Sequence, residues 1–552
     1  MAKKTKAERI PAEHERKMTR QAPAVVAAPA FDLAAHKRRS DRAWTERMQW
    51  DGLYGEAYDY AIPYRRPAAR TGQAATRMDR LFDNTAIVST FRFAGQLQND
   101  LFPPGQTFFK LKPGVFAKLA LGDVDKVELE RTLEGISEVV QAFFLSSEWD
   151  NAIHETCIDL AAGTGCLLIV PGDESQPVRF VNVPADEVAI EPGPYNDHAA
   201  IFWKTKMTRR QIKAAFPNGT FDAKFMEGDN KQPDELMELR QEFVKEGKAW
   251  RFLAYVDRCE RPINDTTLLS QPMIVARYYR VPGEAYGRGP VLLALPTIKT
   301  LNKAMELTLK SAAIQMLGIW GYRPGGAFNP DTARIAPGAW WPMQATGGVL
   351  GADVTRMDVA SGKIDVGNLM TQDLRTQVQA ALHDTQLAPE QGTPKSATEI
   401  MARMRRISEN YMGAFGRLVH EIVPVAVRRV IEIAYDAGLI DQRVPINDLL
   451  VRVDVLSPIA AAIKTQALST IVEFAQLVQA LKGPQAVELI VKLDDALTEI
   501  GLAMGVPASL ILTKEERDEL MAKLAQTAAA VAEAQAGAAG GGEGAEPAPM
   551  AA

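Results

Sequence analysis

The chain has 552 residues, of which 47% are hydrophobic and 24% charged, and this composition predicts a folded protein with about two to four domains. Its formal net charge of −5 excludes a uniformly cationic surface that would grip nucleic acid tightly. Three cysteines without a CxxC pair argue against a disulfide framework or a zinc ribbon, and no apolar run approaches the roughly 18 residues of a membrane span, so we expect a soluble protein made in a reducing cytoplasm.

The N-terminal residues 1–36 are expected to form a flexible basic arm. They begin with several lysines and continue into an Ala/Pro-rich piece that has too few bulky apolar residues to fold alone. From residue 37 to 60, aromatic and charged residues recur at helical spacing, which predicts a first helix. A second helix is predicted from about Arg77 to Leu101, before the turn residues Pro103 to Gln106.

Residues 37–289 read as one mixed helix-and-sheet domain. The part after Cys166 is rich in β-branched and aromatic residues in short runs, which is typical of strands. A short helix is predicted within it, over 207–217. The predicted strands are 167–170, 178–183, 200–205, 252–257 and 274–279.

A glycine-rich turn at 283–289 leads into a predicted helix over 290–319. Pro290 suits a first helical position, because its fixed φ and missing N–H cost little there. One apolar stripe follows at helical spacing, and Pro296 is expected to kink or restart the helix. The stripe consists of Val291, Leu295, Ile298, Met305 and Leu309.

Residues 320–366 form a turn-rich insert that is dense in glycine and proline. It carries four aromatic residues in a piece that is too short to bury them: Tyr322, Phe328, Trp340 and Trp341. These side chains suggest docking onto a neighbouring chain, while packing onto their own domain remains the alternative.

A narrow apolar stripe predicts a second helix over 367–387, and the Pro/Gly-containing stretch 388–395 predicts a loop. Ser396 and Glu399 then have the spacing of a capping box, which marks the start of a long helix over 396–440 that Pro424 should bend. Further helical patterns run through 441–535, and the low-complexity tail 536–552 is expected to be disordered.

Five segments of the chain resemble, in the same order, segments of portal proteins, the head-to-tail connectors of short-tailed bacteriophages. Together they cover roughly Lys37 to Gln526. They are the Leu-Phe-Asp helix at 81–83 with its Pro-Pro-Gly-Gln turn and aromatic strand at 103–111, the segment 207–217, the Tyr-Gly-Arg turn and helix at 286–302, the Ser-Ala-Thr-Glu-Ile opening at 396–400, and Val-Asp-Val-Leu-Ser-Pro-Ile-Ala at 453–460.

The resemblance implies an α+β, mostly helical portal fold, with a wing (37–289 and 396–440), two stem helices (290–319 and 367–387), a clip (320–366), a tunnel loop (388–395) and a crown (441–535). It implies a ring, usually a dodecamer, around a DNA channel at one vertex of the virion capsid, assembled in the host cytoplasm. The implied roles are procapsid nucleation, genome packaging and ejection, and tail attachment. The implied partners are double-stranded DNA, terminase, the major capsid and scaffolding proteins, and a tail adaptor.

Lys299, Lys303 and Lys310 fall close to one face of the first stem helix. In a single chain the simplest interpretation is a solvated face on which Glu306 pairs with Lys303 and Lys310. Repeated around a pore, the same lysines would form rings of positive charge that contact DNA phosphates without sequence preference. By the same reasoning Glu390, Gln391 and Lys395 of the tunnel loop are further candidates for DNA contact.

The sequence contains no motif that would support an enzyme. Gly362-Lys363 lacks the rest of a P-loop, and the Gly-x-Gly pairs at 163–165 and 287–289 lack the third glycine of a dinucleotide fingerprint, so they read as turn glycines. His154 and Cys157 have metal-ligand spacing without a second pair nearby. We therefore expect no catalytic residue, metal or cofactor, and the alternatives to a portal are a nucleic-acid-processing enzyme or a non-portal adaptor or scaffold.

Overall fold

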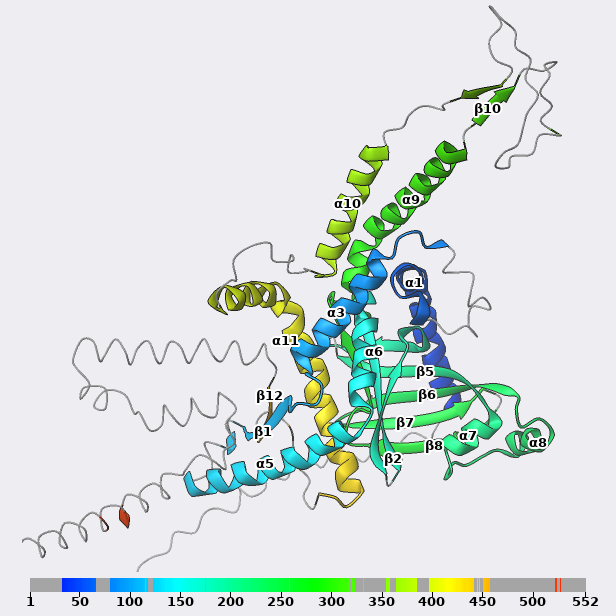
Figure 1. Cartoon of the computed structure of the whole chain (residues 1–552). Helices are drawn as coiled ribbons and strands as arrows, with labels where there is room; N and C mark the ends of the chain where they lie inside the picture. Colours follow the sequence, from blue (N-terminus) through cyan, green and yellow to red (C-terminus); the bar gives the residue numbers. More distant parts are fainter. Residues whose placement is uncertain are drawn as a thin grey trace, which may run out of the picture.

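The computed structural model describes the larger part of the chain. The described residues are 32–65, 80–114, 116–117, 123–173, 175–195, 197–257, 259–317, 319–322, 331, 354–357, 364–384, 397–440, 444, 446, 450–456, 522–523 and 527. They form a mixed α/β body from which a pair of helices projects (Figure 1).

One layer of the body is a five-stranded antiparallel sheet with the order β4-β5-β6-β7-β8. Helix α1 (Leu33–Ala61) lies along it and buries Ala43 against Phe202 and Val244, while the short helices α7 (Arg209–Ala215) and α8 (Ala223–Lys231) cover one end (Figure 1). The strands are β4 (Val188–Pro192), β5 (His198–Thr208), β6 (Leu236–Glu246), β7 (Ala249–Val256) and β8 (Asn264–Leu268).

A second, three-stranded sheet lies at the centre of the main hydrophobic core, in the antiparallel order β3-β2-β9. Its middle strand is buried over its first six residues and apolar from Cys166 onward within them, as expected for a strand that is covered on both faces. The elements are β2 (Thr164–Asp173), β3 (Gln176–Val183) and β9 (Met273–Arg277), surrounded by α3 (Thr85–Leu101), α5 (Asp123–Ser146), α6 (Trp149–Ala162) and α11 (Ala397–Asp436).

Two short strands from distant parts of the sequence complete the body. Strand β1 (Phe109–Pro113) pairs antiparallel with β12 (Val451–Val455), with Leu111 opposite Val453. Both side chains are buried in the main core, which explains the alternating apolar pattern of each strand. In portal proteins the segment that resembles 453–460 begins with a strand, and here β12 covers its first residues and starts two residues earlier.

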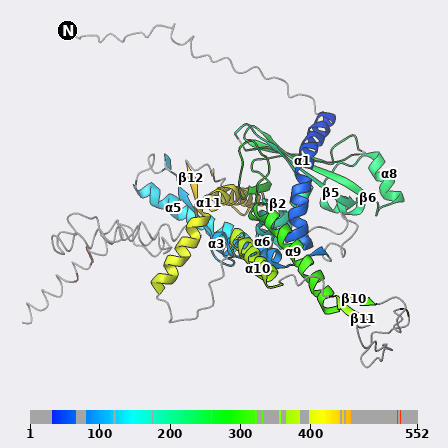
Figure 2. The ribbon, with the colours of Figure 1, turned by 90° about the horizontal axis from the view of Figure 1, so that it is seen from above.

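The projecting part is a hairpin of α9 (Pro290–Leu317) and α10 (Ile364–Ala381), which lie side by side in both views (Figures 1 and 2). At its far end β10 (Ile319–Tyr322) pairs antiparallel with β11 (Val354–Met357). Only the first part of α9 is buried, through Val291, Leu295 and Ile298, so the helix is fixed to the body at its N-terminal end.

Several predicted boundaries are corrected by the structure. Helix α1 starts at Leu33, inside the predicted arm, because the side chain of Asp32 accepts a hydrogen bond from Ala34 N and caps it. Helix α3 starts at Thr85 and not near Arg77, because Asp83 accepts from Thr85 N and holds the preceding residues out of the helix. Helix α10 ends at Ala381, where the chain turns through His383 at a φ of 58°.

The two prolines inside predicted helices interrupt neither of them. Helix α9 continues through Pro296, because the turns on both sides are held by packing, and the hydroxyl of Thr300 donates to Pro296 O at 2.9 Å. Helix α11 begins at Ala397, directly after the predicted capping position, and continues through Pro424. Figure 1 shows that α11 changes direction along its length.

The prediction of strands between residues 166 and 280 is confirmed, although most of the strands are longer than expected and three were missed. Strands β4, β6 and β8, together with helices α5, α6 and α8, were not predicted. Strand β8 contains only polar residues before Leu268 and lies at the sheet edge, where no apolar alternation is required. The tunnel loop, the tail, most of the arm and most of the crown lie outside the described residues.

Candidate functional site: the root and lysine face of helix α9

The two Gly-x-Gly pairs, at 163–165 and 287–289, lie against each other at the N-terminal end of α9, which we call its root. A side chain on Gly163 would come closer than 3.0 Å to the backbone of Gly287, and one on Gly289 would come equally close to the backbone of Ala161. Gly289 N donates to Ala162 O at 3.0 Å. Glycine is required at these positions because two backbones pack directly against each other.

Side chains from α1 and β2 also hold the root of α9 in place through hydrogen bonds to Gly287. The buried hydroxyl of Tyr54 donates to Gly287 O at 2.5 Å and lies 2.8 Å from the hydroxyl of Thr164, which accepts from Gly287 N. Burial raises the pKa of Tyr54, so the hydroxyl keeps its proton and remains a donor. The turn before α9 is thereby fixed to the core from two sides.

Further along α9, Asn302 forms hydrogen bonds with the segment that precedes α3. Its side-chain oxygen accepts from Phe82 N at 2.7 Å and its amide donates to Arg80 O at 3.0 Å. Next to it, Arg375 of α10 donates to Asp83 at 2.9 Å. These contacts tie both helices of the hairpin to one short segment of the body.

The three predicted lysines all lie on α9, and each of them is paired with a carboxylate. Lys299 Nζ is 3.0 Å from a carboxylate oxygen of Glu56 on α1. Lys303 and Lys310 contact Glu306, at 2.8 Å and 2.5 Å. The interpretation as helical ion pairs is confirmed for Lys303 and Lys310, and contact with DNA stays a prediction.

The other predicted site residues are mostly outside the described part of the chain. This holds for Glu390, Gln391 and Lys395 of the tunnel loop and for Phe328, Trp340 and Trp341 of the clip. Tyr322 is described as the last residue of β10, with Val354 as its Cα partner in β11.

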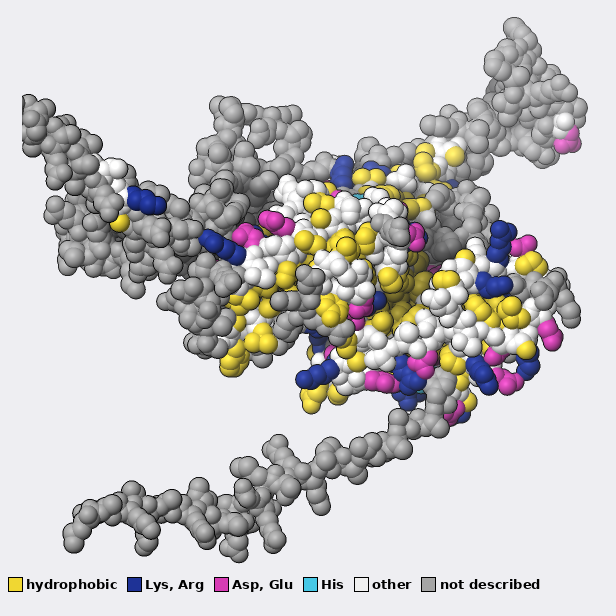
Figure 3. Space-filling view, turned by 90° about the horizontal axis from the view of Figure 1, so that it is seen from below, with side chains coloured by type: hydrophobic (Ala, Val, Ile, Leu, Met, Phe, Trp, Pro, Cys, Tyr) yellow, Lys and Arg dark blue, Asp and Glu magenta, His cyan; other side chains and the backbone are white. Residues whose placement is uncertain are grey.

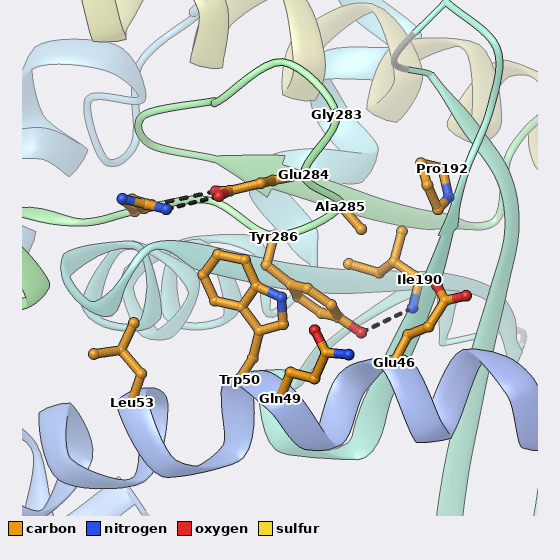
Figure 4. A pocket seen from close by; sticks show the side chains of 11 residues that line it. Glu46, Gln49, Trp50, Leu53, Ile190, Pro192, Gly283, Glu284, Ala285 and Tyr286 are labelled. Atoms are coloured by element: carbon orange, nitrogen blue, oxygen red, sulfur yellow. Dashed lines mark hydrogen bonds and ion pairs between the residues drawn. The ribbon is translucent and has the colours of Figure 1, made fainter.

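A pocket of about 460 Å³ lies beside the root, between α1, β4 and the turn before α9 (Figure 4). Trp50 and Tyr286 form its apolar wall, with ring centroids 5.7 Å apart. Tyr286 accepts from Ile190 N at 3.1 Å, and Glu284 contacts Arg288 at 2.6 Å. We interpret the pocket as bracing for the turn.

The residues weighed as metal ligands serve other purposes. His154 Nδ1 is 2.8 Å from Gln98 Oε1, and Cys157 is fully buried, which raises the pKa of its thiol. Within the described ranges no three His, Cys, Asp or Glu side chains gather in a group that could hold a metal ion. None of the described helices is both long and apolar enough to cross a membrane.

Charge is mixed on the face of the molecule that Figure 3 shows. In Figure 3, basic and acidic side chains are interspersed on the face shown, and no single sign covers a large region of it. This agrees with the formal net charge of −5 and with the absence of a cationic composition.

Two residues of the site were missed by reasoning from the sequence. Glu56 lies far from Lys299 in the chain, so only the packing of α1 against α9 brings them together. Asn302 could have been found, because a polar residue next to the buried Leu301 interrupts the apolar pattern of the helix. The contact between the two glycine pairs had no signal in a single sequence.

The chain belongs to the bacteriophage head to tail connecting protein family, whose model matches residues 33–512. It is similar to the portal protein of Enterobacteria phage T3, with 22% identity over 55% of this chain and 58% of the relative. It is also similar to the portal protein of Escherichia phage T7, with 22% identity over 52% of this chain and 54% of the relative. The chain thus matches little more than half the length of these relatives.

Among solved structures, the chain resembles a chain of the virion of a native gene transfer agent particle. The TM-score is 0.32 at 12% identity, and the alignment covers 74% of this chain and 89% of the other. A chain of the neck of the native particle, computed with C12 symmetry, gives a TM-score of 0.31 at 13% identity over 71% of this chain and 87% of the other.

Proposed function

We propose that this chain is the subunit of a portal ring at one vertex of a phage capsid. Membership of the head-to-tail connecting family and the similarity to two portal proteins support this function. The structural observation that carries it is the α9–α10 hairpin, which projects from the body and is locked at its root by backbone contacts. A hairpin that is held in this way can keep its position in the ring while DNA moves through the channel.

In this proposal α9 and α10 are the stem, the residues around β10 and β11 are the clip, and α1 with the two sheets and α11 forms the wing. The ring would nucleate procapsid assembly with the capsid and scaffolding proteins, dock terminase, and pass double-stranded DNA in and out. It would later bind a tail adaptor. The work is geometric and electrostatic, with no chemical step and no cofactor.

The lysine face of α9, defined by Lys299, Lys303 and Lys310, is proposed to face the DNA. Lys303 and Lys310 are well exposed, and both contact Glu306 of the same helix. A DNA phosphate can therefore take the place of the Glu306 carboxylate at either lysine without any rearrangement of the fold. Contacts of this kind carry no sequence information, which suits a conduit.

Negative-stain electron microscopy of the purified protein tests the assembly. Closed rings with a central hole are expected at moderate salt, whereas monomers or open fibres across a range of salt concentrations would contradict the portal. Rings that fail to support genome packaging in a complementation assay would favour the adaptor or scaffold alternative.

The DNA contact is tested separately with Lys303→Gln and Lys310→Gln combined. We expect normal rings and a lower genome content in particles. Lys299 is left unchanged, because its contact with Glu56 also joins α1 to α9 and its loss would mix two effects. Full genome content in the double variant would show that these lysines do not serve the channel.

A further inference from the structure

The lysine face of α9 contains its own competing anion. Glu306 lies three residues after Lys303 and four before Lys310, and its two carboxylate oxygens contact different lysines. One side chain therefore engages two cations at once. Glu56 of the neighbouring helix α1 forms a single ion pair with Lys299.

The geometry places the anion below the cations. The side chains of Lys303 and Lys310 are 63% and 65% exposed, whereas that of Glu306 is 18% exposed. The contacts from Lys303 and then Lys310 lower the pKa of Glu306 to about 2, so it is ionised at neutral pH. Because Glu306 and Glu56 offset two of the three lysine charges, the face keeps only a small positive charge.

This arrangement changes what the lysines can offer a passing phosphate. A phosphate that contacts Lys303 or Lys310 must displace a carboxylate that is already in place and also repels it. Exposed ion pairs of this kind are weak, so the exchange is easy in both directions. The result is contact that forms and breaks readily.

We propose that Glu306 sets the strength with which this face holds double-stranded DNA, by competing with the phosphates for Lys303 and Lys310. The inference rests on the proposed function, since it requires DNA to reach the lysine face. The role assigned to Glu306 is to lower the affinity of the lysine face for the DNA duplex that has to slide along it.

The test is the salt dependence of binding of a short random-sequence DNA duplex to the purified full-length protein, measured by fluorescence anisotropy. Glu306→Gln keeps the size of the side chain and removes its charge. It should tighten binding and steepen the slope of log K against log salt by about 0.9 for each additional phosphate that the lysines neutralise.

Glu260→Gln is the matched control. Glu260 contacts Lys224 at 2.8 Å, so this change also breaks an exposed Lys–Glu pair. Lys224 belongs to α8, which lies at one end of the five-stranded sheet and away from α9 (Figure 1). The control should leave both the affinity and the slope unchanged. A similar increase in both variants would mean that net charge alone is responsible, and would overturn the proposal.

Combining Glu306→Gln with Lys303→Gln and Lys310→Gln separates this inference from the proposed function. The tighter binding should vanish in the triple variant. If the lysine changes weaken binding but Glu306→Gln alone has no effect, the role of Glu306 is wrong while the DNA contact stands. If none of the variants differs from the unaltered protein, both are wrong.

Discussion

Asn302 is a polar residue between Ile298 and Met305 on the apolar stripe of α9, and its side chain hydrogen-bonds two backbone groups. It accepts from Phe82 N and donates to Arg80 O, two groups of a segment that is neither helix nor strand. Both hydrogen bonds are partly buried, and the pairing of these two backbone groups explains why the helix carries a polar residue here.

Asn302→Ala should destabilise the protein by about 1–2 kcal/mol, because it removes two partly buried hydrogen bonds, each of which contributes about 1 kcal/mol. Urea unfolding measures the loss, and hydrogen exchange at the amide of Phe82 should accelerate. Ser311→Ala at an exposed position of the same helix is the control and should stay within about 0.5 kcal/mol. Equal effects of the two changes would show that the Asn302 contacts are unimportant.

His198, at the start of β5, makes the stability of the fold depend on pH. Burial, followed by the charge of Arg277, lowers the pKa of its imidazole to about 3. The unfolded chain takes up this proton near pH 6.5, whereas the folded chain does so only near pH 3. The unfolded state therefore binds more protons between these values, and stability falls as the pH falls through this window.

His198→Gln should flatten this dependence. Between about pH 6.5 and pH 3 the unaltered protein should lose up to about 1.4 kcal/mol per pH unit more than the variant. Chemical denaturation at several pH values measures the difference, with about pH 7.5 as the reference at which His198 is neutral in both states. Parallel profiles of the two proteins would exclude a role for this imidazole.

At the scale of elements, the central feature is the joint between α9 and the body. The Gly163–Gly165 turn enters β2, and the Gly287–Gly289 turn enters α9. Each turn allows the other to approach, and a Cβ on Gly165 would also lie 2.8 Å from the backbone oxygen of Thr156. The direction in which α9 leaves the body is therefore set by these close backbone contacts together with the side chains that hold the turn, Tyr54 and Thr164.

Gly287→Ala and Gly289→Ala should each destabilise the fold by more than about 4 kcal/mol, because the added Cβ would collide with backbone atoms that cannot move independently. The melting temperature and the yield of folded protein report this. Gly52→Ala in α1 has open space around it and should instead stabilise the protein by up to about 1 kcal/mol. A mild effect at Gly287 or Gly289 would show that the joint is pliable.

At the scale of the whole molecule, a buried charged network joins the N-terminal helix to the central core. Asp159 of α6 is fully buried, 2.9 Å from Arg65 at the end of η2 (Pro63–Arg65), and it also accepts from Tyr58 of α1 and from Asn182 of β3. Three separate elements thus meet on one carboxylate. Removing one partner of such a pair leaves an uncompensated charge.

Asp159→Asn should destabilise the whole body by about 3 kcal/mol or more, because Arg65 keeps only the partly exposed Glu155 as an acidic partner. Glu155→Gln is the comparison and should cost less than about 1 kcal/mol. Denaturant unfolding followed both by tryptophan fluorescence and by circular dichroism measures the two. If the Asp159 variant loses only α1 while the core stays folded, the network joins the parts but does not hold the core.

Much of the fold follows from local patterns in the sequence. The stripe from Val291 to Leu309 predicted α9, because period and propensity act within a single element, whereas β1 was expected from the aromatic strand that the family-like segment at 103–111 implies. Helix α5 and strand β8 were missed because their polar residues give weak periodicity, and their positions depend on what they pack against. The helix boundary at Thr85 depended on one side-chain contact, from Asp83.

The sequence by itself determined the family-like segments, the two separate helices of the hairpin and the lysine face, since each is written in residues that are neighbours along the chain or lie within about two helical turns. The tertiary structure alone decided that the two glycine pairs meet, that Glu56 reaches Lys299 and that Asn302 holds Phe82. The physical reason is that these contacts join residues more than a hundred positions apart, and only the packing of α1, α3, β2 and α9 around one core brings them within bonding distance.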